Sequence, residues 1–218
     1  MFLKLRRIYK DWIRKKTRFL NKVEGSNFID IQDIGLQAGQ EGEKPPVFIS
    51  YATRDGLYDK FIERLSASLG GLKLDHDFET IPACDRRAAS LFKPSFIKFK
   101  LLTLNRPVIW LDADSVILEA IDFPAGDWDV GLIKNDRNSK LPWAACFIYF
   151  NNTPNAMKLL DIWISLCSNH ALERLDHHRL IMSINAASKD VAIKDLSESV
   201  DLKFVRDSGL GKENNRWG

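Results

Sequence analysis

From about residue 47 onwards, the hydrophobic pattern of the chain switches repeatedly between the period of a strand and that of a helix. Short, largely apolar runs predict strands, which fall at residues 47–53, 72–80, 107–111, 129–133 and 143–150. Apolar residues three or four apart predict helices, which fall at residues 56–69, 87–104 and 174–187 and in a segment that begins at Thr153-Pro154. This alternation predicts an α/β fold, an α/β/α sandwich with a mainly parallel central sheet.

Two short signals set helix boundaries within this pattern. Gly70-Gly71 is expected to end the helix at 56–69, because glycine adopts the conformation that closes a helix at little cost. Thr153-Pro154 is expected to start a helix, with the Thr153 hydroxyl as cap and the proline in the first turn. Residues 191–205 carry only weak strand signals.

The first 24 residues differ in charge from the rest of the chain. They hold nine Lys or Arg and two acidic residues, a balance of +7, which leaves 23 basic and 27 acidic residues in 25–218, a balance of −4. Apolar residues interleave with these charges at near-helical spacing, so residues 1–24 are predicted to form a basic amphipathic helix that contacts an anionic membrane surface. Packing of this helix on the domain or on a partner is the alternative. Residues 25–46, rich in Gly and Pro, are predicted to be a linker, and residues 47–218 a single domain.

Composition narrows the class of protein. The chain has 218 residues, of which 45% are hydrophobic and 28% charged, as in ordinary globular proteins. It contains no apolar run of about 18 residues, so no bilayer-spanning helix is predicted. Three scattered cysteines fit reduced thiols of a cytoplasmic protein better than a disulfide framework or a zinc site. The acidic body argues against a nucleic-acid partner. The expected location is the cytoplasm, with peripheral membrane contact through residues 1–24.

The stretch 107–118 carries the clearest chemical signal. An apolar strand runs directly into Asp112 and Asp114, which are spaced as Asp-x-Asp. Ligands of parallel sheets bind where strands end in loops, and alternate residues of an extended segment point the same way. Both carboxylates are therefore expected to reach one hard divalent cation, Mn²⁺ or Mg²⁺, which also binds diphosphate oxygens.

Two other interpretations of these aspartates stay open from the residues alone. Aspartates after a strand often only cap the next turn or helix. Residues 112–116 also fit the Asp-x-Asp-x-(Thr/Val) motif of haloacid-dehalogenase-like phosphatases, in which Asp112 would be the nucleophile and Asp114 the general acid/base. Those enzymes usually carry the motif near the domain start and need a later acid pair, and no adjacent acids follow an apolar strand downstream here.

Three blocks together resemble the nucleotide-diphospho-sugar glycosyltransferases of the Rossmann-like GT-A fold, especially the glycogenin-like and lipopolysaccharide hexosyltransferase group. The blocks are the strand 47–53, the helix with Lys93-Pro94 that leads to Asp112-Ala113-Asp114, and the strand 143–152, and the resemblance covers residues 47–185. It implies that residues 47–218 are a catalytic domain that transfers a sugar from a nucleotide-diphosphate donor. A UDP-sugar is the favoured donor, a glycan or glycolipid the acceptor, and Mn²⁺ or Mg²⁺ the cofactor.

The resemblance also implies roles for individual residues. Asp112 and Asp114 would be the metal ligands, and Lys93 and Asp176 the catalytic residues. Asp176 would face the donor sugar or serve as base, for which Asp136 is the other candidate. The residues implied to bind the donor are Tyr51, Ala52, Thr53, Arg86, Lys93, Asp112, Ala113, Asp114 and Lys212.

The chain departs from this family at three places. The strand 144–151 lacks the family's glycine, and Asp176-His177 stands in place of Asp-Gln. The tail 206–212 keeps the spacing of a His-x-x-Gly-x-x-Lys motif but has Arg206 instead of the histidine. Either Asp207 or water would replace the imidazole on the metal, or Arg206 and Lys212 would bind phosphate directly. A non-catalytic nucleotide-binding or glycan-binding domain is therefore a further alternative.

Overall fold

A computed structural model describes residues 44–54, 57–117, 121, 123, 126–135, 141–169, 175–200 and 205–207. The predicted basic helix at 1–24 and the predicted linker up to residue 43 lie outside this range, so the domain division stays a prediction. Among the described residues, no helix is long and apolar enough to cross a bilayer.

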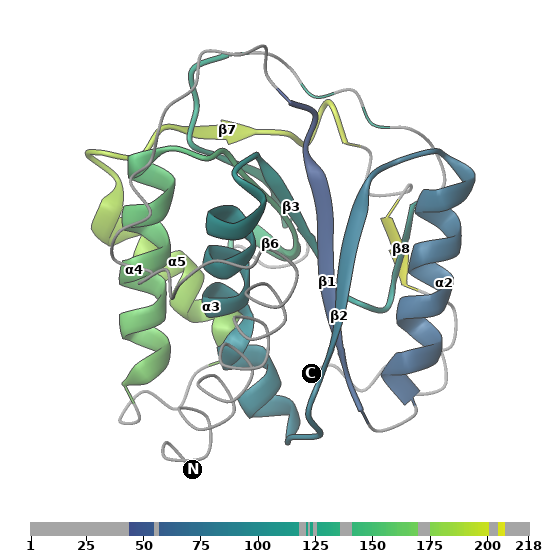
Figure 1. Cartoon of the computed structure of the whole chain (residues 1–218). Coiled ribbons are helices and arrows are strands. Elements are labelled where there is room, and N and C mark those ends of the chain that lie inside the picture. Colours follow the sequence, from purple (N-terminus) through teal and green to yellow (C-terminus); the bar gives the residue numbers. More distant parts are fainter. Residues whose placement is uncertain are drawn as a thin grey trace, which may run out of the picture. The chain divides into compact units, whose positions relative to one another are not determined.

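The centre of the fold is a six-stranded sheet with the order β2-β1-β3-β6-β5-β7 (Figure 1). Its strands are β1 (Val47–Thr53), β2 (His76–Ile81), β3 (Val108–Leu111), β5 (Val130–Lys134), β6 (Trp143–Phe150) and β7 (Ile193–Asp195). Only β6 runs opposite to the other five in this sheet, because it pairs antiparallel with both β3 and β5. The prediction of a mainly parallel central sheet is confirmed.

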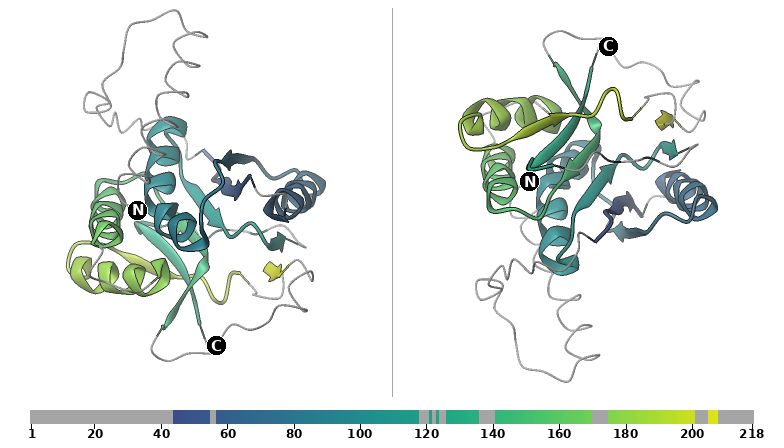
Figure 2. Two further views of the ribbon diagram at one scale, coloured as in Figure 1. Left: turned by 90° about the horizontal axis from the view of Figure 1, so that it is seen from below. Right: turned by 90° about the horizontal axis from the view of Figure 1, so that it is seen from above.

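Helices cover both faces of this sheet. Helices α3 (Arg86–Leu104), α4 (Pro154–Ser168) and α5 (Asp176–Ala187) lie together on one face, and α2 (Leu57–Gly71) lies on the other, as the two views of Figure 2 also show. Burial from both sides explains why β1 is a largely apolar run and β3 an unbroken one. The predicted α/β/α sandwich is therefore confirmed.

Side chains alternate between the two faces along each strand. On the α2 face, Leu65 and Leu69 pack with buried residues of the central strands, namely Phe48, Ile109, Leu111, Phe147 and Tyr149. On the α3 face, the Phe96 ring lies 5.0 Å from that of Tyr51 and 6.0 Å from that of Trp110. The side chains of Trp110 and Asp112, two residues apart, lie on this second face.

A two-stranded antiparallel sheet stands beside the main one. It pairs β4 (Ser115–Ile117) with β8 (Val205–Asp207), and its register sets Ser115 opposite Asp207. The sequence pattern did not predict β4, because a three-residue strand is too short to show a period of two.

Helix boundaries follow the local signals. The helix α2 ends at Gly71, and the chain then turns through Lys73, which has a φ of 57°, so β2 begins at His76 and not at the predicted residue 72. The Thr153 hydroxyl accepts a hydrogen bond of 3.1 Å from the N–H of Ala156 at the start of α4, as predicted. At α3, the Asp85 carboxylate caps the N-terminus by accepting from the N–H of Ala88 at 2.8 Å.

Candidate functional site

The two aspartates of the Asp-x-Asp motif lie on a tight turn at the carboxyl end of β3. The Ser50 hydroxyl donates to the Leu111 carbonyl at 2.7 Å, and the Asp112 N–H donates to the Cys146 carbonyl at 3.0 Å, so neighbouring strands fix the end of β3 on both sides. The N–H of Ser115 then donates to the Asp112 carbonyl at 3.0 Å, which closes a turn over Ala113 and Asp114. The expectation of an extended segment at 112–114 was wrong.

The buried ammonium group of Lys93, on α3, joins two carboxylates that are far apart in the sequence. Lys93 Nζ lies 2.9 Å from Asp112 Oδ1 and 2.8 Å from Asp176 Oδ2, and it donates to the Ala145 carbonyl at 3.2 Å. A lysine ammonium has three N–H donors, so these three oxygens occupy all of them. Burial lowers the pKa of Lys93, but Asp112 and Asp176 outweigh burial and hold that pKa well above its ordinary value, so Lys93 stays charged.

Asp176 lies at the start of α5 and is buried, with a side chain only 10% exposed. Its Oδ2 faces Lys93, and its Oδ1 accepts a hydrogen bond from the Ser90 hydroxyl. Burial alone would raise the pKa of Asp176, but the Lys93 charge and the hydrogen bonds from Lys93, Ser90 and the His177 backbone lower it below its usual range. Asp176 is therefore an ionised carboxylate.

One face of α3 supplies both partners of Asp176. Ser90 and Lys93 are three residues apart, a spacing that brings side chains onto the same face of a helix. Pro94 follows inside the helix and has no N–H to donate to the Ser90 carbonyl, so the helical ladder is interrupted beside these two side chains. Sequence reasoning missed Ser90, although its spacing from Lys93 was a usable signal.

Trp110 was also missed as a site residue, because the run of apolar residues around it reads as core. Its indole Nε1–H donates to Asp112 Oδ1 at 2.8 Å. The usable signal was its position two residues before Asp112, since residues i and i+2 of a strand share one face.

The donor set at the turn fits a hard divalent cation. Lys93, Asp112 and Asp176 together carry one positive and two negative charges, and Asp114 follows Asp112 by two residues in the same turn, so this part of the molecule is acidic. Because Lys93 and Trp110 both donate to Asp112 Oδ1, the oxygen left for a cation on that residue is Oδ2. Within the described ranges, no group of three or more His, Cys, Asp or Glu is arranged so that it could hold a metal ion. Diphosphate and water oxygens would have to complete the coordination shell.

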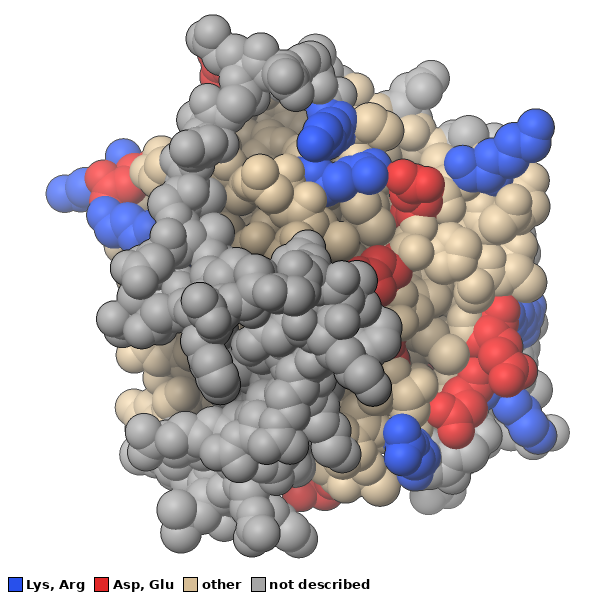
Figure 3. All heavy atoms as spheres, viewed as in Figure 1, with Lys and Arg blue, Asp and Glu red and all other residues tan. Residues whose placement is uncertain are grey.

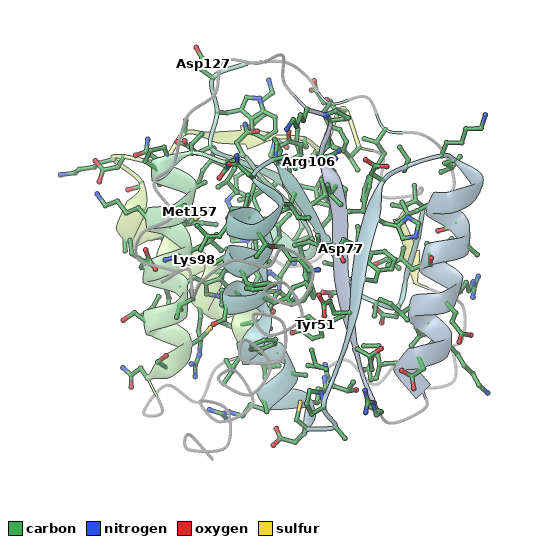
Figure 4. The ribbon with its side chains drawn as sticks, in the orientation of Figure 1. Tyr51, Asp77, Lys98, Arg106, Asp127 and Met157 are labelled. Atoms are coloured by element: carbon green, nitrogen blue, oxygen red, sulfur yellow. The ribbon has the colours of Figure 1, made fainter. Side chains whose placement is uncertain are left out.

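Tyr51, expected at the nucleotide site, lies in the interior between β1 and α3 (labelled in Figure 4). Its hydroxyl donates to the Ala89 carbonyl at 2.6 Å, and its ring contacts Phe92, Phe96 and Trp110. Burial, followed by the charges of Asp176 and Asp112, raises the pKa of Tyr51 well above its ordinary value. The side chain of Tyr51 therefore packs under the carboxylate cluster as a neutral phenol.

The other predicted donor-site residues lie at different depths. Ala52 and Thr53 are buried at the end of β1, Ala113 is buried in the turn, and Arg86 is exposed at the first position of α3. Lys212 and Asp136 lie outside the described residues. The pairing of β8 with β4 does bring the backbone of the tail motif, at Asp207, opposite Ser115 and so next to Asp114.

Cys146 and Cys167, near the carboxylates of the site, have unreactive thiols. Burial, with a contribution from Asp112, raises the pKa of Cys146 to about 12, and burial raises that of Cys167 to about 12. Both are protonated thiols at neutral pH and are unsuited to nucleophilic attack.

No protein-family model matches the chain, and no curated protein sequence matches it. Among solved structures, a glycosyltransferase involved in the glycosylation of the major capsid of PBCV-1 matches 70% of this chain and 83% of its own, with a TM-score of 0.53 and 11% identity. The chain has the GT-A-like fold of glycosyltransferases.

Two further glycosyltransferase structures are similar. GlyE of Streptococcus pneumoniae TIGR4 matches 70% of this chain at 15% identity with a TM-score of 0.44, and the matched part is 46% of GlyE. The galactosyltransferase LgtC, solved with donor and acceptor sugar analogs, matches 63% of this chain and 70% of its own at 10% identity, with a TM-score of 0.43.

Proposed function

We propose that this chain is a metal-dependent glycosyltransferase that transfers a sugar from a nucleotide-diphosphate donor to a glycan or glycolipid acceptor. The observation that supports this most strongly is the cluster of Lys93, Asp112 and Asp176 at the carboxyl end of β3. In open α/β sheets, ligands bind at this edge. The GT-A-like fold makes a nucleotide sugar the first ligand to test there.

Asp112 and Asp114 would hold Mn²⁺ or Mg²⁺, with Asp112 contributing Oδ2. The ion would neutralise charge on the departing nucleoside diphosphate. The residues of the chain then have two tasks: to position the carboxylates of the site, and to place the donor sugar beside Asp176.

Lys93 performs the first of these tasks. All three of its N–H donors are engaged within the protein, so we assign it the positioning of Asp112 and Asp176 in place of the expected contact with the donor. A buried charge paired on two sides also sets the distance between α3, α5 and the end of β3.

Asp176 is a weak candidate for the base that takes the acceptor proton. A general base works best with a pKa near the working pH, whereas the pKa of Asp176 is lowered and both its oxygens accept hydrogen bonds. We therefore propose that Asp176 faces the donor sugar and remains ionised throughout.

The positive charge near the N-terminus supports the proposed glycolipid acceptor and a location at the membrane. The balance of +7 in residues 1–24 supports contact with an anionic membrane surface on the cytoplasmic side, which would bring a glycolipid acceptor close to the site.

The test is transfer or hydrolysis of a panel of nucleotide sugars, UDP-sugars first, with and without Mn²⁺, read as release of nucleoside diphosphate. Asp112→Asn and Asp114→Asn are each expected to lower the rate by about 100-fold or more, because each replaces an anionic ligand of the ion that would stabilise the leaving group with a neutral amide. The matched control is Asp190→Asn, which removes a carboxylate paired with Lys158 on the surface and should leave the rate unchanged. Release of phosphate from simple phosphomonoesters without a nucleotide would support the phosphatase reading instead. Nucleotide binding without turnover would support a non-catalytic domain.

A further inference from the structure

Trp110 stands directly behind the first aspartate of the motif. It is buried on β3, 2% exposed, two residues before Asp112 and on the same face of the sheet. Its indole Nε1–H donates to Asp112 Oδ1 at 2.8 Å, and its ring lies 5.1 Å from Lys93 Nζ. One aromatic side chain therefore touches both members of the Lys93–Asp112 pair.

Aromatic core residues surround the indole. Its ring centroid lies 5.0 Å from that of Tyr51 and 6.0 Å from that of Phe96, both buried. A buried indole N–H needs an acceptor, and the acceptor here is a carboxylate rather than a backbone carbonyl. The indole N–H is thus the group that connects the buried Trp110 ring to Asp112 Oδ1.

Two donors on one oxygen leave the other oxygen for a ligand. Lys93 Nζ and Trp110 Nε1 both contact Oδ1 of Asp112, so its side-chain torsions are set and Oδ2 is presented in one orientation. Partners of this kind behind a metal-binding carboxylate typically change metal affinity by about 10–100-fold when removed.

We propose that Trp110 is a positioning residue, whose indole N–H orients Asp112 for the divalent cation of the donor complex. This inference rests on the proposed function for its consequence, but the hydrogen bond itself can be tested separately. Trp110→Phe removes the N–H and keeps an aromatic ring beside Lys93. Phe96→Leu is the matched control, because it disturbs the same aromatic cluster and keeps the N–H donor.

The first measurement is the NMR signal of the Trp110 indole N–H, assigned by its loss in Trp110→Phe. In Asp112→Ala this signal is expected to shift and its exchange with solvent to accelerate. An unchanged indole signal in Asp112→Ala would overturn the proposal, whether or not the protein is a glycosyltransferase.

The second measurement is Mn²⁺ affinity in the presence of UDP, by titration calorimetry. Trp110→Phe is expected to weaken Mn²⁺ binding about 10–100-fold, while Phe96→Leu leaves it within about twofold even if it unfolds more easily. In an Asp112→Asn background, Trp110→Phe should have no further effect on affinity.

Equal losses of Mn²⁺ affinity in Trp110→Phe and Phe96→Leu would overturn the positioning role. Failure of the wild type to bind Mn²⁺ and UDP, with the indole signal responding as expected, would contradict the proposed function and leave the hydrogen bond standing.

Discussion

Two of the three lysines of α3 are buried between acidic side chains, and the third is more exposed. Lys93 is buried between Asp112 and Asp176, and Lys100 is buried between Asp77 and Glu79. Lys98, labelled in Figure 4, pairs with the exposed Asp161. The loss of folding stability on removing each lysine charge therefore depends on whether its carboxylate partners are buried or exposed.

Lys93→Met is expected to destabilise the fold by about 3–5 kcal/mol, because it leaves two partly buried carboxylates without their cation. Lys98→Met, the control on the same helix, should cost about 0–1 kcal/mol, since its pair is exposed to solvent. Urea denaturation of both variants measures the difference. Equal free energies of unfolding would show that Lys93 does not hold the two carboxylates together.

Asp176 also makes stability depend on pH. Its pKa is lowered in the folded protein, so between the folded and unfolded values the unfolded chain binds more protons. Its contribution is therefore present at neutral pH and is lost as the pH falls below about 5. Urea midpoints measured from pH 7 to pH 3 should converge for wild type and Asp176→Asn at low pH. A constant gap between the two curves would contradict the ion pair.

At the scale of elements, α4 depends on a cap that also joins it to the sheet. The Thr153 hydroxyl accepts from the N–H of Ala156 and donates to Asp129 Oδ1 at 2.6 Å, while Asp129 Oδ2 accepts from the N–H of Ala192 at 2.7 Å. Thr153→Ala should destabilise the protein by about 1–2 kcal/mol, and Thr153→Ser should restore most of the loss. Thermal or urea unfolding measures the stability of both variants. An unchanged free energy of unfolding in Thr153→Ala would show that the cap contributes nothing to stability.

Elements with a complete local signal were predictable from the sequence. The strands β1 and β6 begin and end where the apolar runs do, and α4 begins at the predicted cap. The pairing of β4 with β8 could not be predicted from the sequence. A three-residue strand is too short to show an alternation of apolar and polar residues, and the paired residues are about 90 positions apart.

The site was predictable in its residues more than in its contacts. Asp112, Lys93 and Asp176 were all named from motifs, and the structure brings them together. That one buried ammonium spans both carboxylates depends on how α3 and α5 pack on β3. That packing cannot be predicted from the local sequence around each residue.

At the scale of the whole molecule, charge is unevenly distributed along the chain. On the face shown in Figure 3, basic and acidic side chains are interspersed on the described part. The strong positive charge of the chain lies in residues 1–24, and the residues that follow are acidic overall. Under the proposed function, we therefore expect binding of an anionic donor to depend on a cation at Asp112 and Asp114 rather than on a basic surface.

The most direct test of the proposed metal-dependent donor site is thermal unfolding with a panel of nucleoside diphosphates, with and without Mn²⁺, for wild type, Asp114→Asn and the surface control Asp190→Asn. A ligand at about 100 times its dissociation constant contributes about 2.7 kcal/mol, which raises the midpoint by about 5–10 °C in a domain of this size. We expect such a shift with one nucleotide, only with Mn²⁺, in wild type and Asp190→Asn but not in Asp114→Asn. No shift with any nucleotide in the folded wild type, or an equal shift in Asp114→Asn, would contradict a donor site at this turn.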